Sequence, residues 1–110
     1  MDTELTQAIS DITDSGRLGI TRFVRCVATV EASADLGAVA DSWQVEFRNL
    51  FGCDTSRHIV SGDGKHALTN MTSWPSGQSA ILVVGRVQKG ARPGTDLMIL
   101  GSKGAAYFNE

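Results

Sequence analysis

The feature that most constrains the fold is a long amphipathic stripe in the middle of the chain. It consists of Val39, Trp43, Phe47 and Leu50, with Phe51 beside them. Residues at this spacing share one face of an α-helix, which Ser33 or Asp35 can cap and Gly52 can end. An apolar stripe of this kind belongs to a protein core, so we expect the helix to lie against a β-sheet.

The segments around this helix supply the sheet. Residues 3–14 have the spacing of a shorter helix that Gly16 can end, and residues 22–31 alternate between a buried and a mixed face. Beyond the central helix the pattern predicts strands over residues 56–61, 65–73, 79–87, 96–101 and 105–109. Two turns separate the first three of these strands: Ser61-Gly62-Asp63-Gly64, whose Asp-Gly pair can adopt positive φ, and Trp74-Pro75-Ser76-Gly77.

This order of elements predicts an α+β fold. Runs of strands with helices to one side favour a two-layer sandwich, in which an open and mainly antiparallel β-sheet carries two helices on one face. The length of 110 residues fits a single domain over residues 1–110.

One strand is apolar on both faces. It contains the run Ile81, Leu82, Val83 and Val84. Such a strand is either central and covered on both sides, or part of a contact between subunits. These four residues are therefore the predicted oligomer interface.

Composition and charge narrow the class of function. The net charge is −2 and the basic residues are scattered, so we expect no nucleic-acid partner. No apolar run approaches the ~18 residues of a membrane span, and the acidic N-terminal residues do not resemble a signal peptide, so we expect a cytoplasmic protein without a membrane partner. Cys26 and Cys53 are expected to be free thiols, and the sequence predicts neither a metal site nor another cofactor.

Four segments occur in the order found in a family of oxidoreductases. They are AISDITDSGRLGITRFVRCVATV, DLGAVADSW with the later LFG, HALTNMTSWPSG and DLMILGSKGAAYFN. Over residues 7–109 the chain resembles the C-terminal domain of the glucose–fructose oxidoreductase, inositol dehydrogenase and MocA (Gfo/Idh/MocA) family. The resemblance implies an open antiparallel sheet with helices on one face, and use of the other face for dimer or tetramer formation.

The resemblance also shows what these 110 residues do not contain. The family binds NAD or NADP through a G-x-G-x-x-G motif in an N-terminal Rossmann domain, and this sequence has no such motif. In DLGAVAD, Asp35 and Gly37 match a family motif, but Val39 stands where the catalytic histidine is expected. Valine cannot exchange protons, so we predict no catalytic or cofactor-binding residue and no catalysis by this chain alone.

Three functions remain open. The first is a stand-alone domain that serves as an oligomerising or accessory subunit, either as a homo-oligomer through its sheet face or with a Rossmann-domain-bearing protein. The second is a module that binds a sugar-like or polyol-like molecule in a residual cleft formed by Asp35, Val39, Trp43 and His58. The third is an enzyme with nicotinamide-independent chemistry, in which the base is His58 or His66 and the orienting carboxylate is Asp41 or Asp63.

Overall fold

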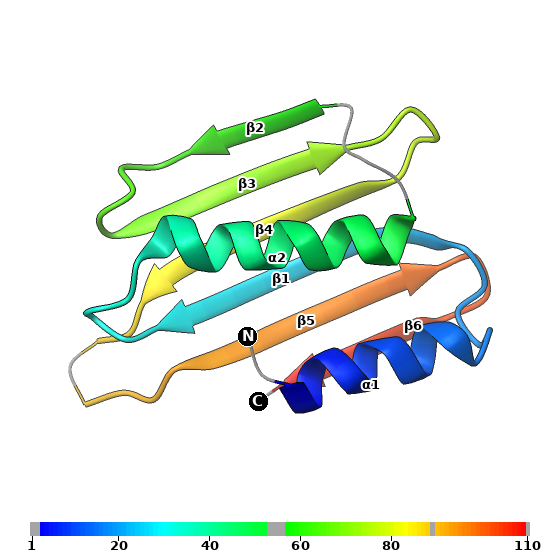
Figure 1. The fold of residues 1–110 in the computed structure, drawn as a ribbon, viewed down its shortest axis with the longest axis horizontal. Helices are drawn as coiled ribbons and strands as arrows, with labels where there is room; N and C mark the ends of the chain where they lie inside the picture. Colours follow the sequence, from blue (N-terminus) through cyan, green and yellow to red (C-terminus); the bar gives the residue numbers. More distant parts are fainter. Residues whose placement is uncertain (1–2, 53–56, 89, 110) are drawn as a thin grey trace.

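The computed structural model describes residues 3–52, 57–88 and 90–109, which form two helices and six strands (Figure 1). In chain order these elements are α1 (Thr3–Asp14), β1 (Thr21–Val30), α2 (Leu36–Phe51), β2 (Arg57–Ser61), β3 (Ala67–Ser73), β4 (Ser79–Arg86), β5 (Gly94–Gly101) and β6 (Ala105–Asn109). The predicted order is confirmed, and the strand boundaries differ from the prediction by at most two residues.

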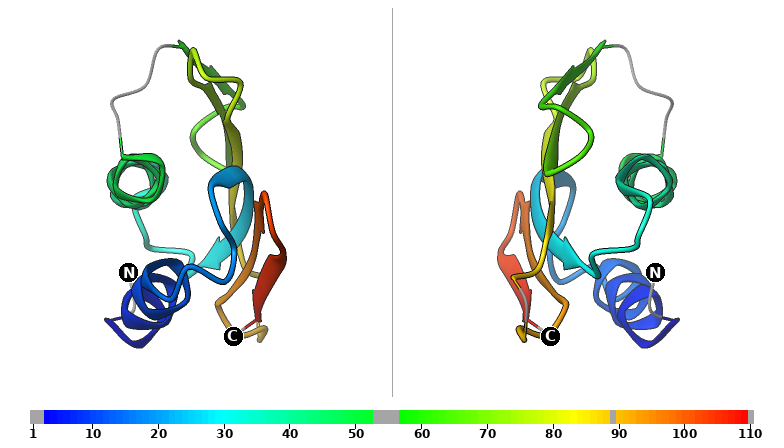
Figure 2. Two further views of the ribbon diagram at one scale, coloured as in Figure 1. Left: turned by 90° about the vertical axis from the view of Figure 1, so that its right-hand side faces the viewer. Right: turned by 90° about the vertical axis from the view of Figure 1, so that its left-hand side faces the viewer.

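The described strands form one sheet in the order β2-β3-β4-β1-β5-β6. β1 is parallel to β4, whereas every other neighbouring pair is antiparallel. Both helices lie on the same side of this sheet, and no other described element covers the opposite face (Figure 2). The predicted α+β fold with helices on one face is therefore confirmed.

The core lies between the sheet and α2. Asp35 caps the helix by accepting a hydrogen bond of 3.2 Å from the Ala38 amide, and Gly52 ends it at a φ of 73°. Trp43 and Phe47 are buried beneath the helix, with their ring centroids 6.0 Å apart. They cover the inner face of the sheet, which includes the buried side chains Val24, Cys26, Ala28, Leu82, Val84, Leu97 and Ile99.

The turn from α1 into β1 is hydrogen-bonded to the turn between β5 and β6. Gly16 and Gly19 both have positive φ, at 76° and 72°, which glycine adopts without steric cost. The Ile20 amide donates to Ser102 Oγ, and the Ser102 amide donates to the Ile20 carbonyl oxygen, each over 2.9 Å. Two glycine-containing segments about eighty residues apart thus form one joint at the edge of the sheet.

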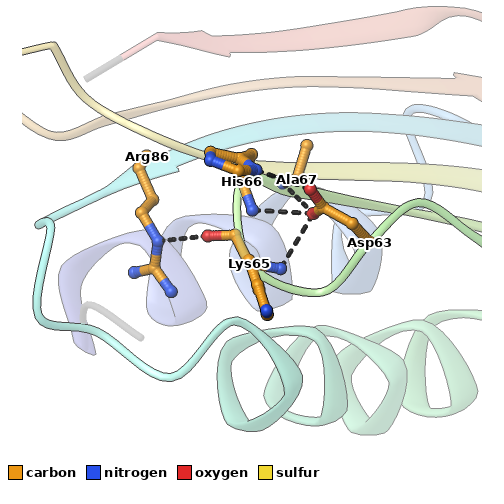
Figure 3. Close-up of polar contacts among 5 residues, drawn as sticks. All are labelled: Asp63, Lys65, His66, Ala67 and Arg86. Carbon is orange, nitrogen blue, oxygen red and sulfur yellow. Dashed lines mark hydrogen bonds and ion pairs between the residues drawn. The ribbon is translucent and has the colours of Figure 1, made fainter.

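The connection between β2 and β3 differs from the tight turn expected from its Asp-Gly pair. Gly62 and Gly64 have positive φ, but no non-glycine residue of the described chain does, so Asp63 does not adopt that conformation. Instead, Asp63 Oδ1 accepts hydrogen bonds from the amides of Lys65, at 2.8 Å, and His66, at 2.7 Å (Figure 3). This side-chain bonding extends the loop, which is why β3 begins two residues later than predicted.

Candidate functional site: the open face of the sheet

The open face of the sheet carries one continuous row of side chains across all six strands. The strand pairings place six residues side by side: Ile59, Met71, Ile81, Arg25, Met98 and Tyr107. On β1, β3, β4 and β5 the neighbours of these residues along the strand are buried, and the strand register places Ile59 and Tyr107 on the same face, so all six point away from the helices. Five of them are apolar or aromatic, with one arginine near the middle.

Several of these side chains are exposed to solvent. Ile59, Met71 and Tyr107 expose 53%, 50% and 57% of their surface, and Leu100 on the same face exposes 38%. A hollow of about 240 Å³ lies over β2, β3 and β4, and Ile59, Met71 and Ile81 line it together with Arg57. A contiguous apolar surface of this kind marks an interaction site more often than a scatter of single exposed residues does.

The predicted interface run, residues 81–84, is divided between the two faces of the sheet. Ile81 and Val83 face the open side, where a contact between subunits stays a prediction. Leu82 and Val84 are fully buried beneath the helices, so their place in the predicted interface is wrong. The reason is the two-residue period of a strand, which sends neighbouring side chains to opposite faces.

The four residues of the predicted residual cleft do not converge on one site. Val39 and Trp43 line a hollow of about 170 Å³ on α2, together with Ala38 and Ser42. Asp35 caps α2, and His58 lies on the edge strand β2; neither is among the residues that line this hollow. Helical spacing does not reveal which edge strand lies near which helix face, so a cleft that includes all four residues stays a prediction.

The structure does bring together one predicted pair, His66 and Asp63. His66 Nδ1 lies 2.5 Å from Asp63 Oδ2, and the His66 side chain is 85% exposed. This hydrogen bond, together with those from the backbone amides of the loop, lowers the pKa of Asp63. Because the same carboxylate holds the loop amides, the pair explains the shape of the turn without invoking catalysis (Figure 3).

Cys26 lies in the core, on the inner face of β1. Burial raises the pKa of its thiol to about 12, with a smaller contribution from the negative charge of Asp96. A buried and protonated thiol is neither a nucleophile nor a metal ligand. Cys26 is a free cysteine, as predicted, while Cys53 lies outside the described residues.

This environment predicts that Cys26 is chemically inert. In a Cys53→Ser variant, where Cys26 is the single cysteine, we expect negligible labelling by a thiol reagent at pH 8, because only about one thiol in ten thousand is ionised at a pKa of about 12. Unfolding in denaturant should release one reactive thiol per chain. Rapid labelling of the folded protein would contradict the buried placement of β1.

A second hollow, not anticipated from the sequence, lies between the two helices. It has a volume of about 210 Å³, and its lining includes Ile9, Leu50 and Glu46. Partial burial raises the pKa of Glu46.

Residues 3–52, 57–88 and 90–109 contain no group of three His, Cys, Asp or Glu side chains close enough to hold a metal ion. Neither described helix has the length and hydrophobicity needed to cross a bilayer.

These features define an α+β domain with one covered and one open sheet face, similar in structure to the C-terminal domain of Gfo/Idh/MocA dehydrogenases. The structure resembles a probable dehydrogenase from Thermotoga maritima, with a TM-score of 0.75 and 14% identity over 94% of this chain. It also resembles an oxidoreductase from Pseudomonas syringae, with a TM-score of 0.74 and 15% identity over 96% of this chain. A third match is a myo-inositol 2-dehydrogenase from Lactobacillus plantarum, with a TM-score of 0.69 and 14% identity over 94% of this chain.

The present chain covers 37%, 33% and 38% of the three matched chains, so it corresponds to about a third of each. At such low identity the similarity establishes the fold expected from the sequence resemblance. No protein-family model matches this sequence, and comparison with curated proteins gives no match.

Proposed function

We propose that this chain is a cytoplasmic, oxidoreductase-related domain that acts by assembly through the open face of its sheet, as an oligomerising or accessory subunit. The observation that supports this role is the apolar row from Ile59 to Tyr107, which crosses every strand of the sheet. A second layer placed on this row removes large apolar side chains from water, which is favourable by roughly 25 cal/mol per Å².

The absence of a convergent reactive site within the described residues favours an assembly role over a catalytic one. Val39 occupies the position where the family resemblance places a catalytic histidine, and it lines a hollow of about 170 Å³ on α2. Cys26 is buried and protonated. The exposed pair of His66 and Asp63 stabilises a turn.

The proposal is tested by placing a charge on the open face. We expect light scattering after size-exclusion chromatography to show a discrete oligomer for the wild-type chain. Met71→Glu should give a folded monomer, because it places a charged carboxylate in the apolar row, where a covering layer would remove that charge from water. Val45→Glu is the matched control, since Val45 on α2 is exposed to nearly the same extent, 48% against 50%, but belongs to the helical layer.

Two results would overturn the proposal of assembly by this chain through its open face. One is a monomeric wild-type chain at concentrations of tens of micromolar. The other is an oligomer that persists in Met71→Glu and disappears in Val45→Glu, which would place the contact on the helical layer. Circular dichroism of each variant shows whether the fold is intact.

A further inference from the structure

The strand β2 forms one edge of the sheet. In the strand order β2-β3-β4-β1-β5-β6 it pairs only with β3, and no described helix or strand lies beyond it (Figure 1). All five of its residues, Arg57–Ser61, are exposed. An edge strand presents a row of backbone N–H and C=O groups that can pair with a further strand, so β2 is a candidate contact surface distinct from the open face.

Apolar side chains lie on both sides of β2. Ile59 points to the open face and exposes 53% of its surface, whereas Val60 points to the helical side and exposes 56%. A layer placed on the open face would cover Ile59 but leave Val60 in water. A strand added beside β2 gives both side chains cross-strand neighbours, so pairing along the edge is the contact that serves both.

β2 lacks the features that usually protect the edge of a sheet. It contains neither proline nor lysine, and its pairing with β3 runs from one end to the other without a bulge. The other edge strand, β6, is different because Ala106 and Phe108 are partly buried against the core, which leaves only one of its faces exposed. Of the two edges, β2 is therefore the more available to an additional strand.

The sequence of β2 is compatible with pairing to itself. In an antiparallel pair about a two-fold axis through residue 59, Ile59 lies opposite Ile59 of the other copy, His58 lies opposite Val60, and Arg57 lies opposite Ser61. The two arginines are at opposite ends of the pair, so they do not face each other. Every second residue of an edge strand directs its backbone groups outward, and in this register such residues meet one another.

We infer that β2 pairs antiparallel with β2 of a second copy of this chain, which joins two six-stranded sheets into one continuous sheet. Paired residues point to the same face of a sheet, so the two-fold axis is perpendicular to it. The helices of both copies then lie on one side, and both open faces lie on the other. This inference goes beyond the proposed function, which concerns the open face alone.

The edge contact is expected to be weak by itself. Five residues of a strand are about 17 Å long, and pairing along that length buries less than the roughly 800 Å² per partner of a stable interface. The pair should therefore form at several hundred micromolar and dissociate at the tens of micromolar used for chromatography. At the lower concentration the measured mass reports on the open face.

Disulfide trapping tests both the pairing and its register. In a Cys53→Ser background, His58→Cys and Val60→Cys place thiols on the helical side of β2, away from the open face. In the inferred pair, residue 58 of one copy lies opposite residue 60 of the other, within the Cα separation that a disulfide spans, whereas residue 58 lies farther from its own counterpart. An equimolar mixture oxidised at several hundred micromolar should therefore give at least about fivefold more disulfide-linked dimer than either variant alone.

The other edge of the sheet supplies the matched control. Ala105→Cys and Asn109→Cys would lie opposite each other if β6 paired with itself about residue 107, and their mixture should give only the background yield. Equal yields from the mixture and from the single variants, or equal yields at the two edges, would indicate random collision and overturn the inference. A mixture of His58→Cys and Val60→Cys that forms no disulfide would overturn it as well. If circular dichroism shows that either variant is unfolded, Arg57→Cys with Ser61→Cys tests the same register.

This inference and the proposed function can fail separately. Trapping between residues 58 and 60 should persist in a Met71→Glu background, because Met71 is on β3 and not on the edge. A wild-type chain that is monomeric in chromatography but is trapped by the mixture would reject assembly through the open face and keep the edge pairing. An oligomer that is lost in Met71→Glu, with no trapping at the edge, would do the reverse.

Discussion

Replacing Phe47 by alanine is expected to destabilise the domain by about 3–5 kcal/mol, the range typical of removing a buried phenylalanine. Phe47 is completely buried on α2, at 0% exposure, and its ring lies beside that of Trp43. No other described helix or strand packs on the outer side of α2, so none of them replaces the lost contacts (Figure 2). The substitution should therefore leave a cavity between helix and sheet.

The effect of Phe47→Ala is large relative to the total stability of such a domain. A chain of this size has a free energy of unfolding of about 5–15 kcal/mol, so the variant should unfold at markedly lower urea concentration or be partly unfolded in buffer. Urea titration followed by circular dichroism measures this. Val45→Ala, on the exposed side of the same helix, should change the stability by no more than about 0.5 kcal/mol. Equal effects of the two substitutions would mean that α2 does not cover the sheet through Phe47.

The helices and strands could be predicted from the sequence because each one is marked by residues that lie close together in the chain. The stripe that includes Trp43 and Phe47 identified α2, and the glycine at residue 52 marked its end. The order of helices and strands, together with the α+β class, followed from periodicity and from turn residues. The parallel pairing of β1 with β4 did not follow, because it depends on a crossover that places β1 in the interior of the sheet.

The candidate site was harder to predict because it depends on register. The apolar run at residues 81–84 signalled a strand with two apolar faces, but only the alternation seen in the folded sheet assigns Ile81 outward and Leu82 inward. Arg25 and Met98, which are neighbours on the open face, are seventy-three positions apart in sequence, and nothing local to either one indicates that they share a face. Their proximity appears only when β1 and β5 are paired.

The joint between the two glycine-containing turns explains why the chain bends so sharply from α1 into β1. A Cβ atom added at Gly101 would collide with the Leu18 carbonyl oxygen and would lie 2.8 Å from the carbonyl carbon of the same residue. That oxygen also accepts a hydrogen bond of 2.9 Å from the Lys103 amide. The backbone of the first turn therefore passes directly over the second turn, at a distance that only glycine permits.

Gly101→Ala is accordingly expected to destabilise the domain by about 1–3 kcal/mol, toward the upper end of that range, because the colliding group is backbone and cannot move aside as a side chain can. Gly85→Ala is the matched control, since Gly85 is also in a strand but has no atom within 4 Å of an added Cβ. It should leave the stability unchanged or raise it by up to about 1 kcal/mol, because alanine restricts the unfolded chain. Thermal and urea unfolding of the two variants compare the same added methyl group at both places. Equal stability of Gly101→Ala and Gly85→Ala would show that the two turns are not in contact, and the sharp bend after α1 would then need another cause.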